Sequence, residues 1–255
     1  MTKSFLGFVP MTWQDSPANR AVTYTIRGDK NMDNQNAILE FRSVTGKNKK
    51  FHLKNVSFCM YPGYIYGLIG ENGAGKTTLM KYIINEHSKY DGQILVDGKD
   101  IKTDYAKIMN RIGYVSEDNA FFENRTGKQN AELLKVFYDD FDMDRFMRAA
   151  KRMDLTVTKT YKKMSRGERL KFQLAFAIAH APGLYLLDEV TAGMDPVFRL
   201  EFFEILRELI QDETCSILMT SHILAEMEMK TDYVGIMQHG TVEEFLESMD
   251  LSERI

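Results

Sequence analysis

The chain has 255 residues and a formal net charge of -3. This length fits one large α/β domain, or one domain with a small inserted subdomain, and the lack of a basic field argues against nucleic acid or acidic lipid as the default partner. No apolar run reaches the ~18 residues that a membrane span needs, and the start of the chain makes a poor signal peptide. Both cysteines lie in apolar stretches, as expected of buried thiols in a reducing compartment.

The first convincing strand pattern begins near Ala37, directly after a polar stretch rich in Asn and Asp. Residues 1–36 are therefore interpreted as an N-terminal extension outside the core, either an arm, a segment without function or the result of a start assigned too early. A chain that begins at Met32 is expected to fold with a similar melting temperature.

From Ala37 onward, short β patterns alternate with turns, and the pattern becomes helical after Ser116. Strands are predicted at residues 37–44, 51–60, 64–70, 93–98, 111–116, 183–190, 215–222 and 233–240. Helices are predicted at residues 76–83, 130–138, 144–153, 168–180 and 197–210. This order predicts an α/β domain over residues 37–255, with a mostly parallel sheet and a helical insertion between about residues 121 and 180.

The sequence GENGAGKT, from Gly70 to Thr77, lies between a predicted strand and a predicted helix and matches the phosphate-loop pattern. The glycines at 70, 73 and 75 allow successive N–H groups to turn toward one point, and the positive end of the helix adds to their field. Lys76 is expected to be an exposed loop cation that reaches the β and γ phosphates of a nucleotide. The Thr77 hydroxyl is expected to bind Mg²⁺.

Two further segments support the interpretation of residues 70–77 as a phosphate-binding loop. LYLLDE is an apolar strand pattern that places Asp188 near the magnesium ion and Glu189 where it can polarise a water, although a strand ending in two carboxylates is weak evidence alone. In MSRGE, Ser165 and Glu168 form the S-x-x-E pattern of a capping box that opens a helix. A capped helix start with a glycine in its first turn is also an anion site.

At MSRGE the sequence resembles the ATP-binding subunits of ABC transporters, whose signature LSGGQ corresponds to this stretch. The resemblance extends over roughly residues 37–242, with the motifs in family order. TAGMDP, with Asp195, is similar to the D-loop, and MTSH places His222 at the position of the switch histidine. The resemblance implies a P-loop NTPase with an added antiparallel β subdomain, and its details look closest to bacterial export-type subunits.

In this family two ATPase domains face each other head to tail, and each ATP lies between the Walker A loop of one and the signature helix of the other. The resemblance implies ATP contacts at Gly70, Glu71, Asn72, Gly73, Ala74, Gly75, Lys76, Thr77, Thr78, Ser165, Gly167 and Asp195. It implies Mg²⁺ ligands at Thr77, Asp188 and Glu117. Glu189 would be the general base, and His222 would contact the γ-phosphate.

Three departures from the family pattern affect this transfer. Glu117 stands where the family usually has a glutamine, and Arg166 replaces the first signature glycine. The aromatic residue that stacks on adenine is not at the expected spacing, which falls near Lys47. Phe51 is the nearest candidate, and an apolar strand residue is an equally good interpretation of it.

The implied partners are a separate transmembrane permease and a second ATPase subunit, identical or different, with no nucleic acid. The implied location is cytoplasmic, on the inner face of the cell membrane.

The alternative function is that of a soluble ABC-type ATPase in translation or DNA repair, although such proteins usually carry two ATPase units or a long coiled coil. A small-molecule P-loop kinase would leave MSRGE, TAGMDP and MTSH unexplained. A multi-span membrane protein in a neighbouring reading frame would favour transport.

Overall fold

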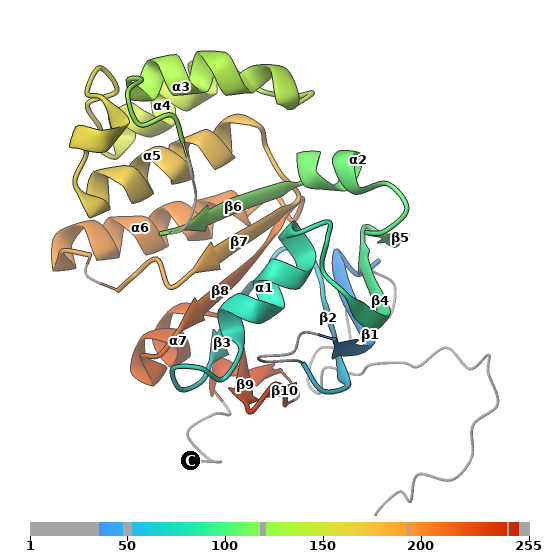
Figure 1. The fold of residues 1–255 in the computed structure, drawn as a ribbon. Coiled ribbons are helices and arrows are strands. Elements are labelled where there is room, and N and C mark those ends of the chain that lie inside the picture. Colours follow the sequence, from blue (N-terminus) through green and yellow to red (C-terminus); the bar gives the residue numbers. More distant parts are fainter. Residues whose placement is uncertain (1–35, 48–52, 118–120, 193, 244, 250–255) are drawn as a thin grey trace, which may run out of the picture.

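The computed structural model describes residues 36–47, 53–117, 121–192, 194–243 and 245–249, and a mostly parallel sheet runs through its centre (Figure 1). The strands of this sheet are β3 (Ile65–Ile69), β6 (Ile112–Ser116), β7 (Leu184–Asp188), β8 (Ser216–Ser221), β9 (Tyr233–Gln238), β10 (Thr241–Val242) and β11 (Leu246–Glu247). Their order is β10-β9-β3-β8-β7-β6, and β11 pairs with β9. Strands β9, β3, β8, β7 and β6 pair in parallel, whereas β10 and β11 are antiparallel to β9.

A second sheet is entirely antiparallel. Its strands are β1 (Leu39–Gly46), β2 (Val56–Met60), β4 (Tyr90–Val96) and β5 (Lys99–Asp100), in the order β2-β1-β4-β5. Phe41 of β1 lies opposite Phe58 of β2, and their rings stack with centroids 4.7 Å apart. Such aromatic cross-strand pairs hold the register of neighbouring strands.

The helical part of the chain lies between β6 and β7 in sequence and above these strands in Figure 1. It consists of α3 (Gly127–Leu134), the 3₁₀ turn η2 (Lys135–Phe137), α4 (Met143–Arg152), the 3₁₀ turn η3 (Tyr161–Lys163) and α5 (Arg166–Ala179). The short helix α2 (Tyr105–Asn110) precedes β6. Rings of Phe121, Tyr161 and Phe176 surround Phe172 of α5, and this aromatic packing joins α5 to the segments around it.

Two hydrophobic cores lie on opposite faces of the central sheet, because successive strand residues point to opposite sides. Tyr66 and Leu68 of β3 pack with the antiparallel sheet and with α1 (Lys76–Ile84), whereas Ile65 and Ile69 pack with α5 and α6 (Pro196–Leu209). The remaining helix, α7 (Leu224–Lys230), follows β8. Helices α1 and α5 therefore belong to different cores on different faces of the sheet.

The structure confirms the predicted α/β class, the mostly parallel central sheet and the antiparallel β sheet implied by the resemblance. Residues 1–35, with Met32, lie outside the described residues, so the N-terminal extension remains a prediction. Cys59 and Cys215 are buried, as expected. Within the described ranges, every helix is too short or too polar to cross a membrane.

Candidate active site

The phosphate loop connects β3 to α1 and depends on glycine for two different reasons. Gly73 and Gly75 have positive φ angles of 84° and 118°, which residues with a Cβ rarely adopt. Gly70 faces the backbone of β9, where an added Cβ would lie 2.3 Å from the Met237 carbonyl oxygen. Gly75 is also the N-cap of α1, so the loop leads directly into the positive end of that helix.

Lys76 is buried, with only 3% of its side chain exposed, so the prediction of an exposed loop cation was wrong. As the first residue of α1 it lies inside the curve of the loop, and its Nζ donates hydrogen bonds to the carbonyls of Gly70 (2.7 Å) and Glu71 (3.3 Å). Nζ also lies 3.2 Å from Oε1 of Glu189. These oxygens take the place of water around the ammonium group.

Asp188 ends the buried strand β7, as predicted, and is itself 7% exposed. Its Oδ1 accepts a hydrogen bond of 2.7 Å from the Thr220 hydroxyl, and its carboxylate is also hydrogen bonded to Thr77. Burial raises the pKa of Asp188, an effect that these two hydrogen bonds oppose. Asp188 and Thr77, both expected to bind Mg²⁺, therefore lie together.

Thr220 is a further site residue, which was not among the residues predicted from the sequence. It lies opposite Asp188 in the parallel pairing of β7 and β8, and the Glu189 amide donates to its hydroxyl at 2.9 Å. One buried hydroxyl thus fixes both carboxylate residues at the end of β7. The available signal was a polar residue within the predicted buried strand, two positions before His222.

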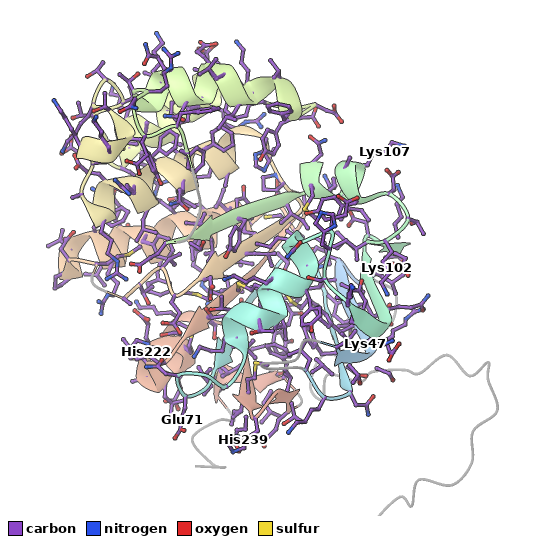
Figure 2. The ribbon with its side chains drawn as sticks, viewed as in Figure 1. Lys47, Glu71, Lys102, Lys107, His222 and His239 are labelled. Carbon is purple, nitrogen blue, oxygen red and sulfur yellow. The ribbon has the colours of Figure 1, made fainter. Side chains whose placement is uncertain are left out.

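Glu189 and His222 also meet at this end of the sheet. Nδ1 of His222 lies 3.6 Å from Oε2 of Glu189, so the same carboxylate faces a lysine through one oxygen and a histidine through the other. Glu189 has a positive φ of 51°, a sharp turn directly after the strand. In the view of Figure 2, His222 and Glu71 of the phosphate loop are both labelled in the lower left part of the molecule.

The predicted capping box at the start of α5 is present. The Ser165 hydroxyl accepts a hydrogen bond from the Glu168 amide, and the Glu168 carboxylate accepts one from the Ser165 amide. Glu168 is also hydrogen bonded to Lys159, and these contacts lower the pKa of its carboxyl group. Gly167, by contrast, is open: apart from its chain neighbours and the backbone of its own helix, no described residue has a heavy atom within 4 Å of the place where a Cβ would lie.

Two of the three departures from the family pattern, Arg166 and Glu117, are brought together by the fold. Arg166 and Glu117 form an ion pair in which each side chain is about half exposed. The pair is supported by a buried contact behind it, where the Ser116 amide donates to Oε1 of Gln173 on α5. Glu117 is thus engaged by the start of α5 rather than by Thr77 and Asp188, so its role as a metal ligand remains a prediction.

The donor set around Thr77 and Asp188 suits Mg²⁺. A hydroxyl and a carboxylate are hard oxygen ligands, and protein magnesium sites commonly combine one or two carboxylates with substrate phosphates and water. Across the described residues, no group of three or more His, Cys, Asp and Glu side chains could form an all-protein metal cage. The residues present therefore fit a magnesium ion bound together with a nucleotide.

The remaining predicted contacts lie in several settings. Asp195 caps α6 by accepting a hydrogen bond of 2.9 Å from the Phe198 amide, which gives it a structural role whatever else it binds. Glu71 and Asn72 are exposed, Ala74 is buried and Thr78 is half-buried.

Neither candidate position for the adenine contact is supported by the structure. Lys47 is exposed and paired with Asp91, whereas Phe51 lies outside the described residues. The adenine contact therefore remains unassigned.

Comparisons with known proteins agree with this geometry. Residues 53–192 match the family described as ABC transporter. The ABC transporter ATP-binding protein YtrB of Bacillus subtilis (strain 168) is 32% identical over 201 residues, which cover 79% of this chain and 68% of that protein. The bacitracin transport ATP-binding protein BcrA of Enterococcus faecalis is 28% identical over 225 residues, which cover 88% and 71% of the two chains.

Solved structures of ABC transporter subunits are also similar to this chain. A structure of an ATP-binding subunit of an ABC transporter is 25% identical and aligns with a TM-score of 0.76 over 85% of this chain and 92% of that chain. CbiO1 from Clostridium perfringens, described as part of the ABC transporter complex cbiONQ, is also 25% identical. It aligns with a TM-score of 0.72 over 86% of this chain and 92% of its own.

Proposed function

The chain belongs to the ABC transporter family as an ATP-binding subunit that hydrolyses ATP, and we propose that it powers export through a separate membrane permease. The observation that carries the catalytic part is the meeting of Lys76, Glu189 and His222 beside Asp188 at one end of the sheet. The carboxyl edge of parallel strands is the usual position of ligands in such folds.

We propose that the loop amides and Lys76 bind the phosphates, with Lys76 exchanging its contacts with loop carbonyls for contacts with phosphate oxygens. Thr77 and Asp188 would hold Mg²⁺, which when bound would neutralise phosphate charge. Glu189 would accept a proton from the attacking water. His222, 3.6 Å from that carboxylate, would orient it and contact the γ-phosphate.

We also propose that the ATP site is completed by a second ATPase subunit. Helix α1, which follows the phosphate loop, and α5, which begins at Arg166, pack on opposite faces of the central sheet. One nucleotide on the loop is therefore not enclosed by Ser165 and Gly167 of the same chain. The open space at Gly167 and the capped start of α5 suit contact with a phosphate brought by a partner.

A separate permease on the inner face of the cell membrane is the proposed second partner. CbiO1, a structural relative, is described as one part of a larger transporter complex, and BcrA is described as a bacitracin transport ATP-binding protein. The likeness of MSRGE and its neighbouring motifs to export-type subunits supports the outward direction. The protein would then be cytoplasmic and should co-purify with membranes that contain its permease.

Trapping the ATP-bound state tests the catalytic assignment and the pairing together. In Glu189→Gln the side chain keeps its shape but loses its basicity, so ATP should bind without being consumed and the paired state should accumulate. Light scattering with Mg²⁺-ATP should then show a dimer, or a tighter complex within the transporter. Adding Gly167→Trp should prevent this association while leaving the melting temperature within a few degrees, because Gly167 has open space around it.

Rapid hydrolysis by Glu189→Gln would show that the base lies elsewhere. Association that persists in Glu189→Gln/Gly167→Trp would show that the start of α5 is not part of the paired interface. A subunit that pairs only with a different ATPase chain would be revealed by mixing the variant with the solubilised transporter, where the same Gly167→Trp change should still prevent closure.

A further inference from the structure

The carboxylate of Glu226, on α7, is buried among groups from three segments, and only 8% of its side chain is exposed. Its Oε2 accepts a hydrogen bond of 2.6 Å from the Thr191 hydroxyl and one of 3.4 Å from the Ser221 hydroxyl. Thr191 is two residues after Glu189, and Ser221 directly precedes His222. One carboxylate thus links the two chain segments that carry the proposed base and the proposed histidine.

Arg199 of α6 completes this cluster. Its Nη2 donates to the carbonyls of Thr191 (3.2 Å) and Met194 (3.3 Å), and its Nε lies 3.6 Å from Oε1 of Glu226. Neither Nε of Arg199 nor Oε1 of Glu226 has a hydrogen-bond partner among the described residues, although both atoms are buried. The guanidinium therefore holds the loop after β7 from its carbonyl side and supplies the counter-charge for the buried carboxylate.

From these contacts we infer that Glu226 is a positioning residue for hydrolysis. Its carboxylate keeps the loop after Glu189 in register with the end of β8, directly before His222. The inference rests on the proposed ATPase site. It deepens that proposal by assigning the 3.6 Å approach of Glu189 and His222 to a buried cluster behind them. None of the named contacts of Glu226 involves the phosphate loop, so the cluster serves hydrolysis and not nucleotide capture.

The energetics favour a positional role over a purely stabilising one. A buried carboxylate is costly unless hydrogen bonds and a counter-charge offset its lost hydration, and apolar residues of similar volume often replace such pairs without loss of stability. The geometry that the charged cluster specifies is harder to replace, because hydrogen bonds to a carboxylate are short and directional.

Thr191 offers a matched test, because its hydroxyl is 2.6 Å from Glu226 and the residue is 1% exposed. Thr191→Val keeps the shape but removes the donor, whereas Thr191→Ser keeps the donor. For the loss of one hydrogen bond to a charged group, Thr191→Val should lower kcat by about tenfold. The KM for ATP and the binding of a fluorescent ATP analogue should stay within about twofold, and Thr191→Ser should restore kcat.

A second variant tests whether the contacts form one unit. Glu226→Gln keeps an acceptor for Thr191 but removes the counter-charge of Arg199, and it should also lower kcat at unchanged KM. Thr191→Val/Glu226→Gln should be no slower than the slower single variant, because both changes act on the same link. All variants are compared at equal folded fraction by circular dichroism, in the full-length chain.

Three outcomes would overturn the inference: wild-type kcat in Thr191→Val, a kcat for Thr191→Ser as low as that of Thr191→Val, or kcat losses that multiply in the double variant. Failure of the proposed function would look different, because the wild-type chain would then release no phosphate from ATP, or Glu189→Gln would hydrolyse ATP at the wild-type rate.

Discussion

The phosphate-loop end of the sheet and the start of α5 differ in how much of their surroundings this chain supplies. Lys76 is 3% exposed and is surrounded by loop carbonyls and the Glu189 carboxylate. At the start of α5, Gly167 faces open space and the Arg166–Glu117 pair is about half exposed. Folding alone assembles the first region, whereas the second is held in shape by its cap but leaves the space at Gly167 unfilled.

The largest effect should come from breaking the assembled region. Lys76→Ala removes the only proposed phosphate-binding ammonium group, and the rate of phosphate release should fall by at least about 100-fold, as when a transition-state donor is removed. Lys107→Ala is the matched control, because Lys107 is 79% exposed on α2 and is labelled at the upper right of Figure 2, away from Glu71 and His222 at the lower left. Its turnover should match the wild type.

Because Lys76 is buried, circular dichroism must first establish that Lys76→Ala is folded. Wild-type turnover by a folded Lys76→Ala protein would remove the phosphate loop from the mechanism.

Acid should weaken the helical side of the molecule. His180 follows α5, its ring stacks on Tyr138 at 4.2 Å, and burial lowers its pKa to about 4 from an ordinary 6.5. Between these pH values His180 binds fewer protons in the folded state than in the unfolded state, so the free energy of unfolding rises with pH. The contribution of His180 to this free energy is therefore lost as the pH falls from 6.5 to 4. At full effect this amounts to roughly 3 kcal/mol.

His180→Gln keeps a hydrogen-bond donor for the Ile112 carbonyl but does not titrate. Urea unfolding at a series of pH values should therefore show a smaller loss for this variant between pH 6.5 and 4. Parallel curves for the two proteins would mean that acid acts through other groups.

The smallest effect concerns the exposed ion pair. Arg166 lies at the positive end of α5, where a cation is unfavourable, and Glu117 offsets that charge. Glu117→Gln should therefore lower the free energy of unfolding when Arg166 is present, and it should change this free energy little in the Arg166→Gly background. A coupling of about 0.2–1 kcal/mol is expected from a double-mutant cycle in thermal unfolding. If Glu117 instead binds Mg²⁺, Glu117→Gln should raise the magnesium requirement for turnover equally in both backgrounds.

Features that depend on local sequence were predictable. The strand end at Asp188, the loop glycines and the capping box at Ser165 each follow from a few adjacent residues, because strand periodicity, φ preference and capping are local properties. The order of these motifs also carried the family resemblance. The central sheet could be predicted for the same reason, since strand and helix patterns alternate along the chain.

Features that depend on contacts between distant residues were not predictable. The burial of Lys76 follows from how the loop curves around it, and the roles of Thr220 and Glu226 follow from the alignment of β7 with β8 and from the packing of α7. The pairing of Glu117 with Arg166 joins residues 49 positions apart in the sequence, and neither residue type alone indicates it.

Two glycines of this chain meet different physical constraints, and natural selection would act on them differently. Any side chain at Gly70 would collide with the Met237 backbone, so selection for folding alone disfavours substitution there. At Gly167 the isolated chain has room for a side chain, and folding does not select against one. The pressure to keep Gly167 would then act on assembly, and a lineage that lost its partner could accept larger residues at position 167 long before it could accept one at position 70.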